Sequence, residues 1–123
     1  MKKKILIIDD SKSLRSAADF TLKSAGFDTV QAGDGVEGLE ALKTIDEADI
    51  GMIITDINMP NMDGIAFIKE VKKTKFKFVP ILVLTTEAQE EKKKEGQQAG
   101  ASGWLVKPFN SEQLINIVEK FVE

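Results

Sequence analysis

The stretch ILIIDDSK, residues 5–12, runs four aliphatic residues directly into two aspartates. A short, continuous apolar run is typical of a strand that is covered on both faces, as in a parallel sheet. Carboxylates that follow such a strand without a spacer lie where the strand leaves the core. We therefore interpret residues 5–8 as a buried strand that brings Asp9 and Asp10 to the carboxyl-terminal edge of a sheet.

Similar apolar runs recur along the chain, separated by segments with helical periodicity. The further runs cover residues 52–54, 81–84 and 104–106, with a weaker and more polar one around Thr29 and Val30. The apolar stripes of the helical segments are Leu14, Ala18, Thr21, Leu22 and Ala25; Val36, Leu39 and Leu42; Ile65, Ile68 and Val71; and Leu114, Ile117, Val118 and Phe121. The order strand, helix, repeated five times, indicates an α/β architecture with right-handed crossovers.

Helix ends are marked by residue types that favour them. Ser11 or Ser13 is a candidate N-cap for the first helix, and Asn110 or Ser111 for the last. Gly26 is a suitable stop for the first helix, because glycine accepts the backbone conformation that ends helices.

The segment AQEEKKKEGQQ, residues 88–98, occupies a helix position but has no large apolar side chain. Gly96 lowers its helix stability further, by about 1 kcal/mol relative to alanine. The segment predicts a poorly anchored helix; the alternative is an ordinary solvated surface helix.

Composition limits the classes of function. A chain of 123 residues with 42% hydrophobic and 30% charged residues is typical of one soluble globular domain. The net charge of −3 disfavours nucleic-acid binding, and the absence of cysteine and histidine excludes disulfides, thiolate or imidazole zinc sites and Ser-His-Asp catalysis. No apolar run approaches the ~20 residues of a membrane span. The N-terminal run is too short for an export signal, so we expect a cytoplasmic protein without membrane insertion.

Polar residues follow four of the apolar runs. Asp9 and Asp10 follow the first, Asp56 the third, Thr85 and Thr86 the fourth, and Lys107 the fifth. Because the carboxyl ends of parallel strands meet at one edge, where open α/β sheets bind ligands, these side chains are expected together. The second run is the most polar and belongs at an edge, which favours the strand order 2-1-3-4-5. Asp9, Asp10 and Asp56 would then flank the crevice between the first and third strands.

Three clustered carboxylates need a compensating charge. At ~4 Å they repel by a few kcal/mol per pair, which protonation or a bound cation relieves. An all-oxygen site suits Mg²⁺, and Lys107 supplies a second positive charge. Such a site can also accept a phosphoryl group, with a carboxylate as nucleophile forming an aspartyl phosphate.

Five motifs give the chain a resemblance to a known family. They are DD at 9–10, DINMPNMDG at 56–64, TTEA at 85–88, QAGASGW at 98–104 and KPF at 107–109. Together they resemble the CheY-like receiver domains of two-component response regulators, over essentially the whole chain. The resemblance implies a flavodoxin-like fold with helices on both faces of the sheet. It also implies a single receiver domain over residues 1–123 without an output domain, acting as a phosphorylation-dependent signalling switch and not as an enzyme on other substrates.

The resemblance also implies a role for each motif residue. Asp56 would be the phosphoacceptor, and Asp9, Asp10, Asp56 and the backbone carbonyl of Asn58 would hold Mg²⁺. Lys107 would pair with a phosphoryl oxygen, and its bond to Pro108 would be cis. Pro60 and Gly64 would shape the loop after the phosphorylation site.

Other residues would serve the switch and the lifetime of the phosphoryl group. Thr85 would be the switch hydroxyl and Trp104 the coupled aromatic, at a position that is usually Tyr or Phe. Thr86 is bulkier than the usual Ala or Gly and would narrow access to the phosphoryl site. Asn58 and Glu87 match a pattern of fast self-dephosphorylation.

The partners implied are a CheA-like histidine kinase, a phosphatase and a downstream target such as the flagellar motor switch, for a monomer acting in chemotaxis. The alternative is a single-domain phosphorelay intermediate or a regulator of another pathway. A haloacid dehalogenase-type phosphatase would need the motif DxD after the first strand and a cap domain. A flavin-binding module would need a phosphate-cradling loop there.

We interpret the basic stretch VKKTKFKF, residues 71–78, as a solvated surface in preference to a site for an anionic partner.

Overall fold

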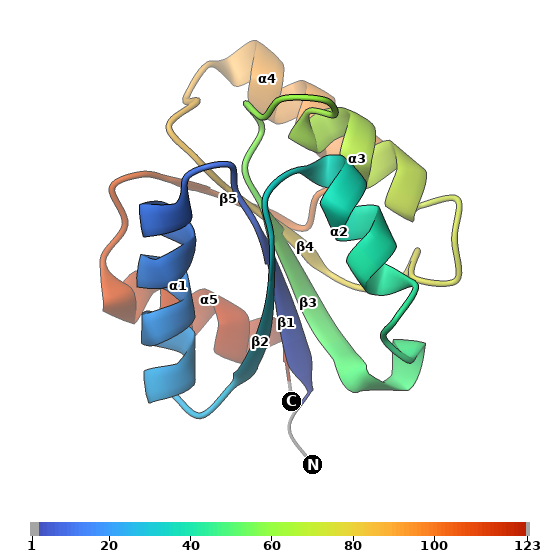
Figure 1. Ribbon diagram of the computed structural model, residues 1–123. Coiled ribbons are helices and arrows are strands. Elements are labelled where there is room, and N and C mark those ends of the chain that lie inside the picture. Colours follow the sequence, from blue (N-terminus) through green and yellow to red (C-terminus); the bar gives the residue numbers. More distant parts are fainter. Residues whose placement is uncertain (1–2, 123) are drawn as a thin grey trace.

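Parallel strands alternate with α-helices in the computed structural model, which describes residues 3–122 (Figure 1). The strands are β1 (Lys4–Ile8), β2 (Asp28–Ala32), β3 (Ile50–Thr55), β4 (Ile81–Thr85) and β5 (Gly103–Val106). The α-helices are α1 (Lys12–Ser24), α2 (Gly35–Leu42), α3 (Gly64–Val71), α4 (Glu90–Ala99) and α5 (Ser111–Phe121), and a 3₁₀ turn, Glu47–Asp49, precedes β3.

The strand order is β2-β1-β3-β4-β5, and every neighbouring pair is parallel. The predicted fold class and order are therefore confirmed, including the edge position of the polar β2. Ile8 at the end of β1 lies opposite Ala32 of β2 and Thr55 of β3. Because of this register, Asp9 and Asp56 leave the sheet side by side.

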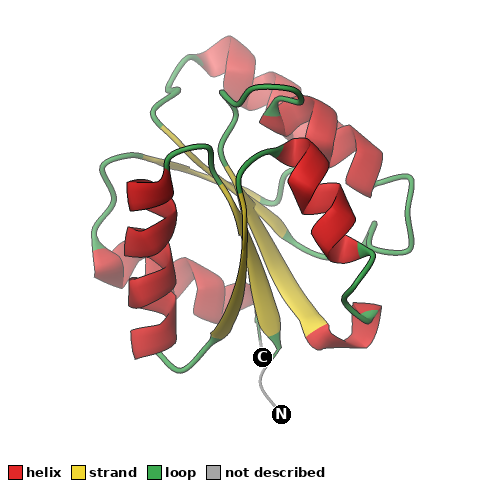
Figure 2. Cartoon of the chain, in the orientation of Figure 1, coloured by secondary structure: helices red, strands yellow, loops and turns green. Residues whose placement is uncertain are grey.

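Helices cover both faces of the sheet, and each face has its own apolar core (Figure 2). The two faces follow from the alternation of side chains along a strand. In β1, Leu6 and Ile8 point to the core under α2 and α3, whereas Ile5 and Ile7 point to the core under α1 and α5.

The helix caps settle two alternatives that the sequence left open. The Ser11 hydroxyl accepts a hydrogen bond from the backbone N–H of Leu14, so Ser11 is the N-cap of α1. Asn110 caps α5 and forms a capping box with Gln113. Gly26 has a φ of 93°, which supports its prediction as a helix stop.

Three residues of the predicted apolar stripes are exposed. Leu14, Val36 and Phe121 are 38%, 45% and 40% exposed. Each lies in the first or last turn of its helix. We attribute the exposure to that position, because the end of a helix extends past the side chains it packs on.

One burial prediction for the strands was wrong. Residues 104–106 were expected to be covered on both faces, but β5 is half-buried throughout. It forms the second edge of the sheet, and its neighbour α4 has no large apolar side chain with which to cover it. Within residues 3–122, no helix has the length and apolar composition needed to cross a bilayer.

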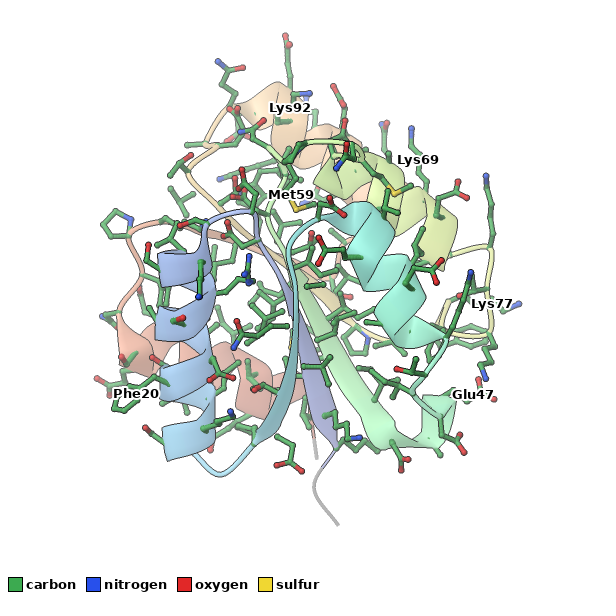
Figure 3. The ribbon with its side chains drawn as sticks, viewed as in Figure 1. Phe20, Glu47, Met59, Lys69, Lys77 and Lys92 are labelled. Carbon is green, nitrogen blue, oxygen red and sulfur yellow. The ribbon has the colours of Figure 1, made fainter. Side chains whose placement is uncertain are left out.

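The unusual compositions of α4 and of residues 71–78 have visible consequences. Among the described residues of α4, only Gly96 is buried, and charged side chains such as Lys92 extend outwards (Figure 3). In the basic stretch, Lys73, Lys75 and Lys77 are exposed, which agrees with a solvated surface. Phe76 instead belongs to the core, and Phe78 is 86% exposed.

Candidate functional site

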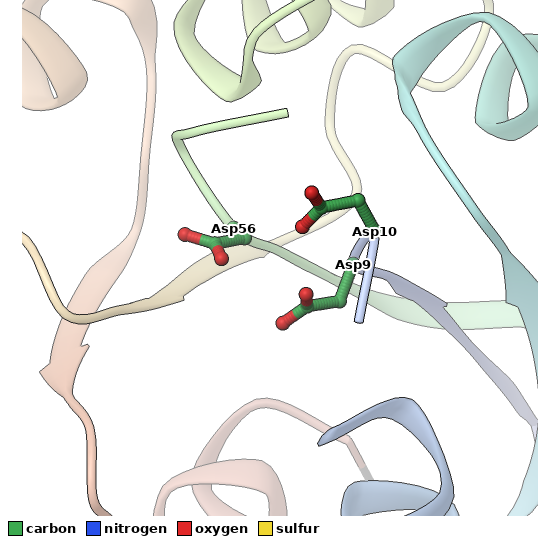
Figure 4. Close-up of side chains that lie close together, drawn as sticks. All are labelled: Asp9, Asp10 and Asp56. Carbon is green, nitrogen blue, oxygen red and sulfur yellow. The ribbon is translucent and has the colours of Figure 1, made fainter. Parts of the chain in front are cut away.

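Three carboxylates from two neighbouring strands meet at the carboxyl-terminal edge of the sheet. Asp9 and Asp10 follow β1, and Asp56 follows β3 (Figure 4). One carboxylate oxygen of each lies within 4.8 Å of the others. Asp9 and Asp56 are buried, whereas Asp10 is exposed. The structure thus brings together the acidic residues that the sequence placed at this edge.

Lys107 reaches this cluster from the end of β5. Its Nζ lies 2.5 Å from Oδ2 of Asp9 and 3.1 Å from Oδ2 of Asp56, and all three groups are buried. Strand β4 separates β5 from β3, a distance of about 10 Å between strands, which a lysine side chain can span. The backbone N–H of Lys107 donates to the carbonyl of Thr85 at 2.7 Å, and this bond fixes the backbone from which the lysine side chain extends.

The cluster has more negative than positive charge. Three carboxylates face one ammonium group, so the formal charge of these four side chains is −2. Burial makes uncompensated charge costly, because protein groups replace the water that would solvate it. This electrostatic imbalance favours the binding of a cation.

Backbone N–H groups hold the two buried carboxylates. Oδ1 of Asp9 accepts from Ser11 at 2.9 Å, and Oδ1 of Asp56 accepts from Ile57 at 2.6 Å. The Arg15 guanidinium donates to the carbonyl of Asp9 at 2.5 Å. Asp10 is exposed, and within residues 3–122 its carboxylate has no hydrogen bond or ion pair.

The donor set fits Mg²⁺. The oxygens of an octahedral Mg²⁺ site lie about 2.0–2.1 Å from the ion, so adjacent ligands are about 2.9 Å apart and opposite ligands about 4.1 Å. Oxygens already within 4.8 Å of one another need only a small approach to meet this geometry. Asp9, Asp10 and Asp56 are the side chains able to hold the ion. Asn58, whose carbonyl is the expected further ligand, lies exposed in the loop after β3.

The residues after β4 connect through hydrogen bonds to Trp104 on β5. The Thr85 side chain is buried, and its Oγ1 accepts from the backbone N–H of Glu87 at 3.2 Å. The carbonyl of Glu87 accepts from the indole Nε1 of Trp104 at 3.0 Å. Thr86 is exposed beside them, and Glu87 and Trp104 are half-buried.

The loop that follows Asp56 is closed by Gly64, at the start of α3. The Gly64 N–H donates to the carbonyl of Ile57 at 2.8 Å. A Cβ at Gly64 would lie 2.0 Å from the carbonyl oxygen of Asp56, so only glycine fits against this backbone. The peptide bond between Lys107 and Pro108 is cis.

Two residues that the sequence did not indicate as partners, Asp34 and Asn61, support the same loop. Asp34 caps α2, where its carboxylate accepts from the Glu37 N–H at 2.9 Å and from the Asn61 side chain at 2.8 Å. Asn61 has a φ of 67°, an uncommon conformation for a residue other than glycine. The sequence GDG before an apolar helical stripe was an available signal for the cap, but nothing local indicated Asn61 as its partner.

Comparison with known proteins agrees with this geometry. The family model of the response regulator receiver domain matches residues 5–119. The chain belongs to this family. The chemotaxis protein CheY-3 of Vibrio cholerae is 37% identical to this receiver domain, over 98% of the chain and 92% of that protein. The chemotaxis protein CheY of Pseudomonas aeruginosa is 36% identical, over 98% and 96%.

A solved structure shows the same fold. The chemotaxis protein CheY4 of Vibrio cholerae matches with a TM-score of 0.91 and 43% identity, over 98% of this chain and 99% of that one. The receiver domain is therefore CheY-like in sequence and fold, and it is a domain of two-component signalling. This membership favours a signalling role over the phosphatase and flavin-binding alternatives.

Proposed function

We propose that the protein is a phosphorylation-dependent signalling switch in which Asp56 accepts a phosphoryl group from a phosphohistidine of a CheA-like kinase. The observation that carries this proposal is the shared ion pair of Asp56 and Asp9 with Lys107, next to the free carboxylate of Asp10. This cluster of side chains supplies a nucleophile, a fixed positive charge and the ligands of a cation at one place.

The transfer is a displacement at phosphorus. A carboxylate oxygen of Asp56 forms the new P–O bond, the P–N bond to the kinase histidine breaks, and the imidazole nitrogen keeps the electron pair. The Lys107 ammonium group is positioned to pair with a phosphoryl oxygen. Asp9, Asp10, Asp56 and the carbonyl of Asn58 would hold Mg²⁺, which would neutralise phosphoryl charge when bound.

Phosphorylation acts on the rest of the molecule through Thr85. The phosphoryl group adds about −1.5 to −2 charges and strong acceptor oxygens. The Thr85 hydroxyl turns towards them and gives up its bond to the Glu87 N–H. Because Glu87 also holds the indole of Trp104, the change reaches the surface formed by α4, β5 and α5, which binds the target.

Chemotaxis is the proposed context, supported by the chemotaxis proteins among the relatives. The proposed partners are a CheA-like histidine kinase, a phosphatase and the flagellar motor switch as target, with the protein acting as a monomer. A role as a phosphorelay intermediate uses the same site and differs only in the final acceptor. Asn58 and Glu87 are proposed to shorten the life of the phosphoryl group.

The test uses the single tryptophan as a reporter. Mg²⁺ is added first, then acetyl phosphate or beryllofluoride, and Trp104 fluorescence is followed in the wild type, Asp56→Asn and Asp28→Asn. Asp28 is an exposed carboxylate at the opposite edge of the sheet and serves as the matched control. We expect a response in the wild type and in Asp28→Asn, and none in Asp56→Asn. An equal response in all three would refute the proposed phosphoacceptor.

A second prediction concerns the rate at which a small phosphodonor reaches Asp56. Thr86 is exposed next to the Thr85 switch hydroxyl, and its side chain is larger than that of alanine. We expect Thr86→Ala to be phosphorylated faster by acetyl phosphate than the wild type. Stopped-flow fluorescence of Trp104 measures both rates, and equal rates would show that Thr86 does not limit access.

A further inference from the structure

Helix α4 has few apolar contacts with the rest of the molecule, one of which is the partly buried Ala99 at its last position, packed against the core under α2 and α3. Its sequence, EEKKKEGQQA, contains no large apolar residue, and within the described chain Gly96 is its one buried residue. Its N-cap, Gln89, makes no side-chain capping bond within residues 3–122. The contact at Gly96 is therefore, with that of Ala99, one of the few that can position α4.

The ring of Trp104 lies against Gly96. A Cβ added at Gly96 would be 2.7 Å from Cζ3 and 3.3 Å from Cε3 of the indole. Real Cβ atoms essentially never approach a neighbour to 2.7 Å, so the six-membered ring occupies the space that a side chain at 96 would fill.

The indole is also held at its other end. Its Nε1–H donates to the carbonyl of Glu87 at 3.0 Å. A ring held by a hydrogen bond at the pyrrole side cannot slide away from a new methyl group without losing that bond or displacing α4. The same Glu87 residue donates its N–H to Thr85 Oγ1 at 3.2 Å. Gly96, Trp104, Glu87 and Thr85 thus form one continuous set of contacts.

Glycine is an unfavourable choice inside a helix unless a contact requires it. It lowers helix stability relative to alanine because the unfolded chain has more conformational freedom. Gly96 has no positive φ, so its backbone conformation does not require glycine. The close approach of the indole is the remaining reason for glycine at this position.

We infer that Gly96 is a positioning residue of the switch. The space left by its missing side chain, here called the seat, holds the Trp104 indole, and the indole in the seat sets the position of α4. The coupling of this seat to Asp56 rests on the proposed function, whereas the seat itself does not. When Thr85 turns away from Glu87, the indole leaves the seat and α4 loses the contact between Gly96 and the ring.

The first experiment examines the resting protein, without Mg²⁺ or a phosphodonor. In Gly96→Ala the added methyl group displaces the indole towards solvent. We expect a red shift of Trp104 emission and stronger quenching by acrylamide. Gln98→Ala is the matched control, because it makes an exposed position of the same helix more helix-favouring without contacting the ring. Unchanged emission and quenching in Gly96→Ala would overturn the inference.

A second experiment compares the effect of Gly96→Ala on the thermal unfolding midpoint in the presence and absence of Trp104. The shift of the midpoint should have opposite signs in the two backgrounds. In the presence of Trp104, Gly96→Ala should lower the unfolding midpoint, because the methyl group collides with the ring. In a Trp104→Ala background the collision is absent, and the same substitution should raise the midpoint through helix propensity. A higher midpoint in both backgrounds would show that no seat exists.

Two further measurements separate the seat itself from its link to phosphorylation. If Gly96→Ala does not fold, amide exchange in Trp104→Ala tests the seat alone: exchange should accelerate in α4 and not in α5, and unchanged exchange in α4 would count against the inference. The link to phosphorylation is tested with beryllofluoride, which should produce a smaller fluorescence change in Gly96→Ala than in the wild type. A wild type that does not respond would refute the proposed function and leave the tests of the resting protein valid.

Discussion

At the scale of single residues, Gly64 shows how closely the backbone packs behind Asp56, the proposed phosphoacceptor. Its Cα faces the carbonyl of Asp56, and a Cβ would lie 2.0 Å from that oxygen and 2.9 Å from its carbon. Neither atom can move without shifting Asp56. The requirement for glycine here is therefore steric, since its φ is not positive.

We predict that Gly64→Ala lowers the free energy of unfolding by at least the ~1–3 kcal/mol of an overpacked core site, and that it weakens Mg²⁺ binding. Gly33→Ala is the control, because a Cβ there would meet mainly the flexible end of Glu37. The control should stay within about 0.5 kcal/mol of the wild type. Urea unfolding measures both variants, and equal stabilities would contradict the steric explanation.

Asp34 is a second residue whose environment has a measurable consequence. The backbone N–H of Glu37, followed by the Asn61 side chain, lowers the pKa of the Asp34 carboxyl from 3.8, against a smaller opposing effect of burial. A folded-state pKa below the unfolded one means that the charged form stabilises the fold. This contribution is present above the unfolded pKa and is lost as the pH falls through the folded pKa.

We predict that Asp34→Asn removes this contribution while keeping an N-cap acceptor for α2. The difference in unfolding free energy between wild type and variant should be constant near neutral pH and should shrink as the pH falls below 3.8. Denaturant unfolding of both proteins from neutral to acidic pH measures it. A difference independent of pH would show that the charge of Asp34 does not contribute.

At the scale of elements, α4 and α5 are helices of similar length with different anchoring. In α5, Leu114 and Val118 are fully buried and Asn110 forms a capping box. In α4, Gly96 is the one buried position among the described residues, and the ion pairs Lys92–Glu95 and Lys93–Glu90 are 3.8 and 3.9 Å long with largely exposed partners. Exposed ion pairs of this kind contribute little to stability.

We predict that the amides of α4 exchange with solvent through local opening, faster than those of α5. The reason is that separating α4 exposes little apolar surface, whereas separating α5 exposes part of one core. Amide hydrogen exchange followed by mass spectrometry or NMR compares the two helices in the same molecule. Equal protection in α4 and α5 would exclude a weakly anchored α4.

At the scale of the whole molecule, Mg²⁺ bound at the proposed site would link folding stability to the concentration of the ion. A ligand that binds only the folded state stabilises it, by about 2.7 kcal/mol at a concentration of 100 times its Kd. Without the ion, the surplus of negative charge acts against folding. Asp10 contributes to the surplus without an ion pair of its own within residues 3–122, whereas Asp9 and Asp56 share Lys107.

We predict that Asp10→Asn has opposite effects in the two conditions. Without Mg²⁺ it should raise the unfolding midpoint, because like charges ~4 Å apart repel by about 1 kcal/mol per pair even in water. With Mg²⁺ it should lose most of the stabilisation that the wild type gains. Thermal unfolding with EDTA and with Mg²⁺ measures both effects, and Asp28→Asn should behave as the wild type. A midpoint lowered by Asp10→Asn in EDTA would contradict the charge argument.

The sequence alone determined the architecture and the place of the site. Alternating apolar runs and helical stripes predict the five strands and five helices, and the polarity of residues 28–32 puts that strand at an edge. The position of Asp9, Asp10, Asp56 and Lys107 directly after apolar runs predicts that they meet. These properties are readable because strand and helix periods, and the shared edge of a parallel sheet, depend on neighbouring residues and on topology.

Only the tertiary structure decided which groups touch. The collision distance at Gly96, the bond from Asn61 to Asp34 and the carbonyl against Gly64 each join segments that lie apart in the chain. The half-burial of β5 also depends on its neighbour, since an apolar strand is covered only where the adjacent helix offers apolar side chains. Contacts of this kind depend on tenths of an ångström between packed elements, and residue periodicity does not encode distances that fine.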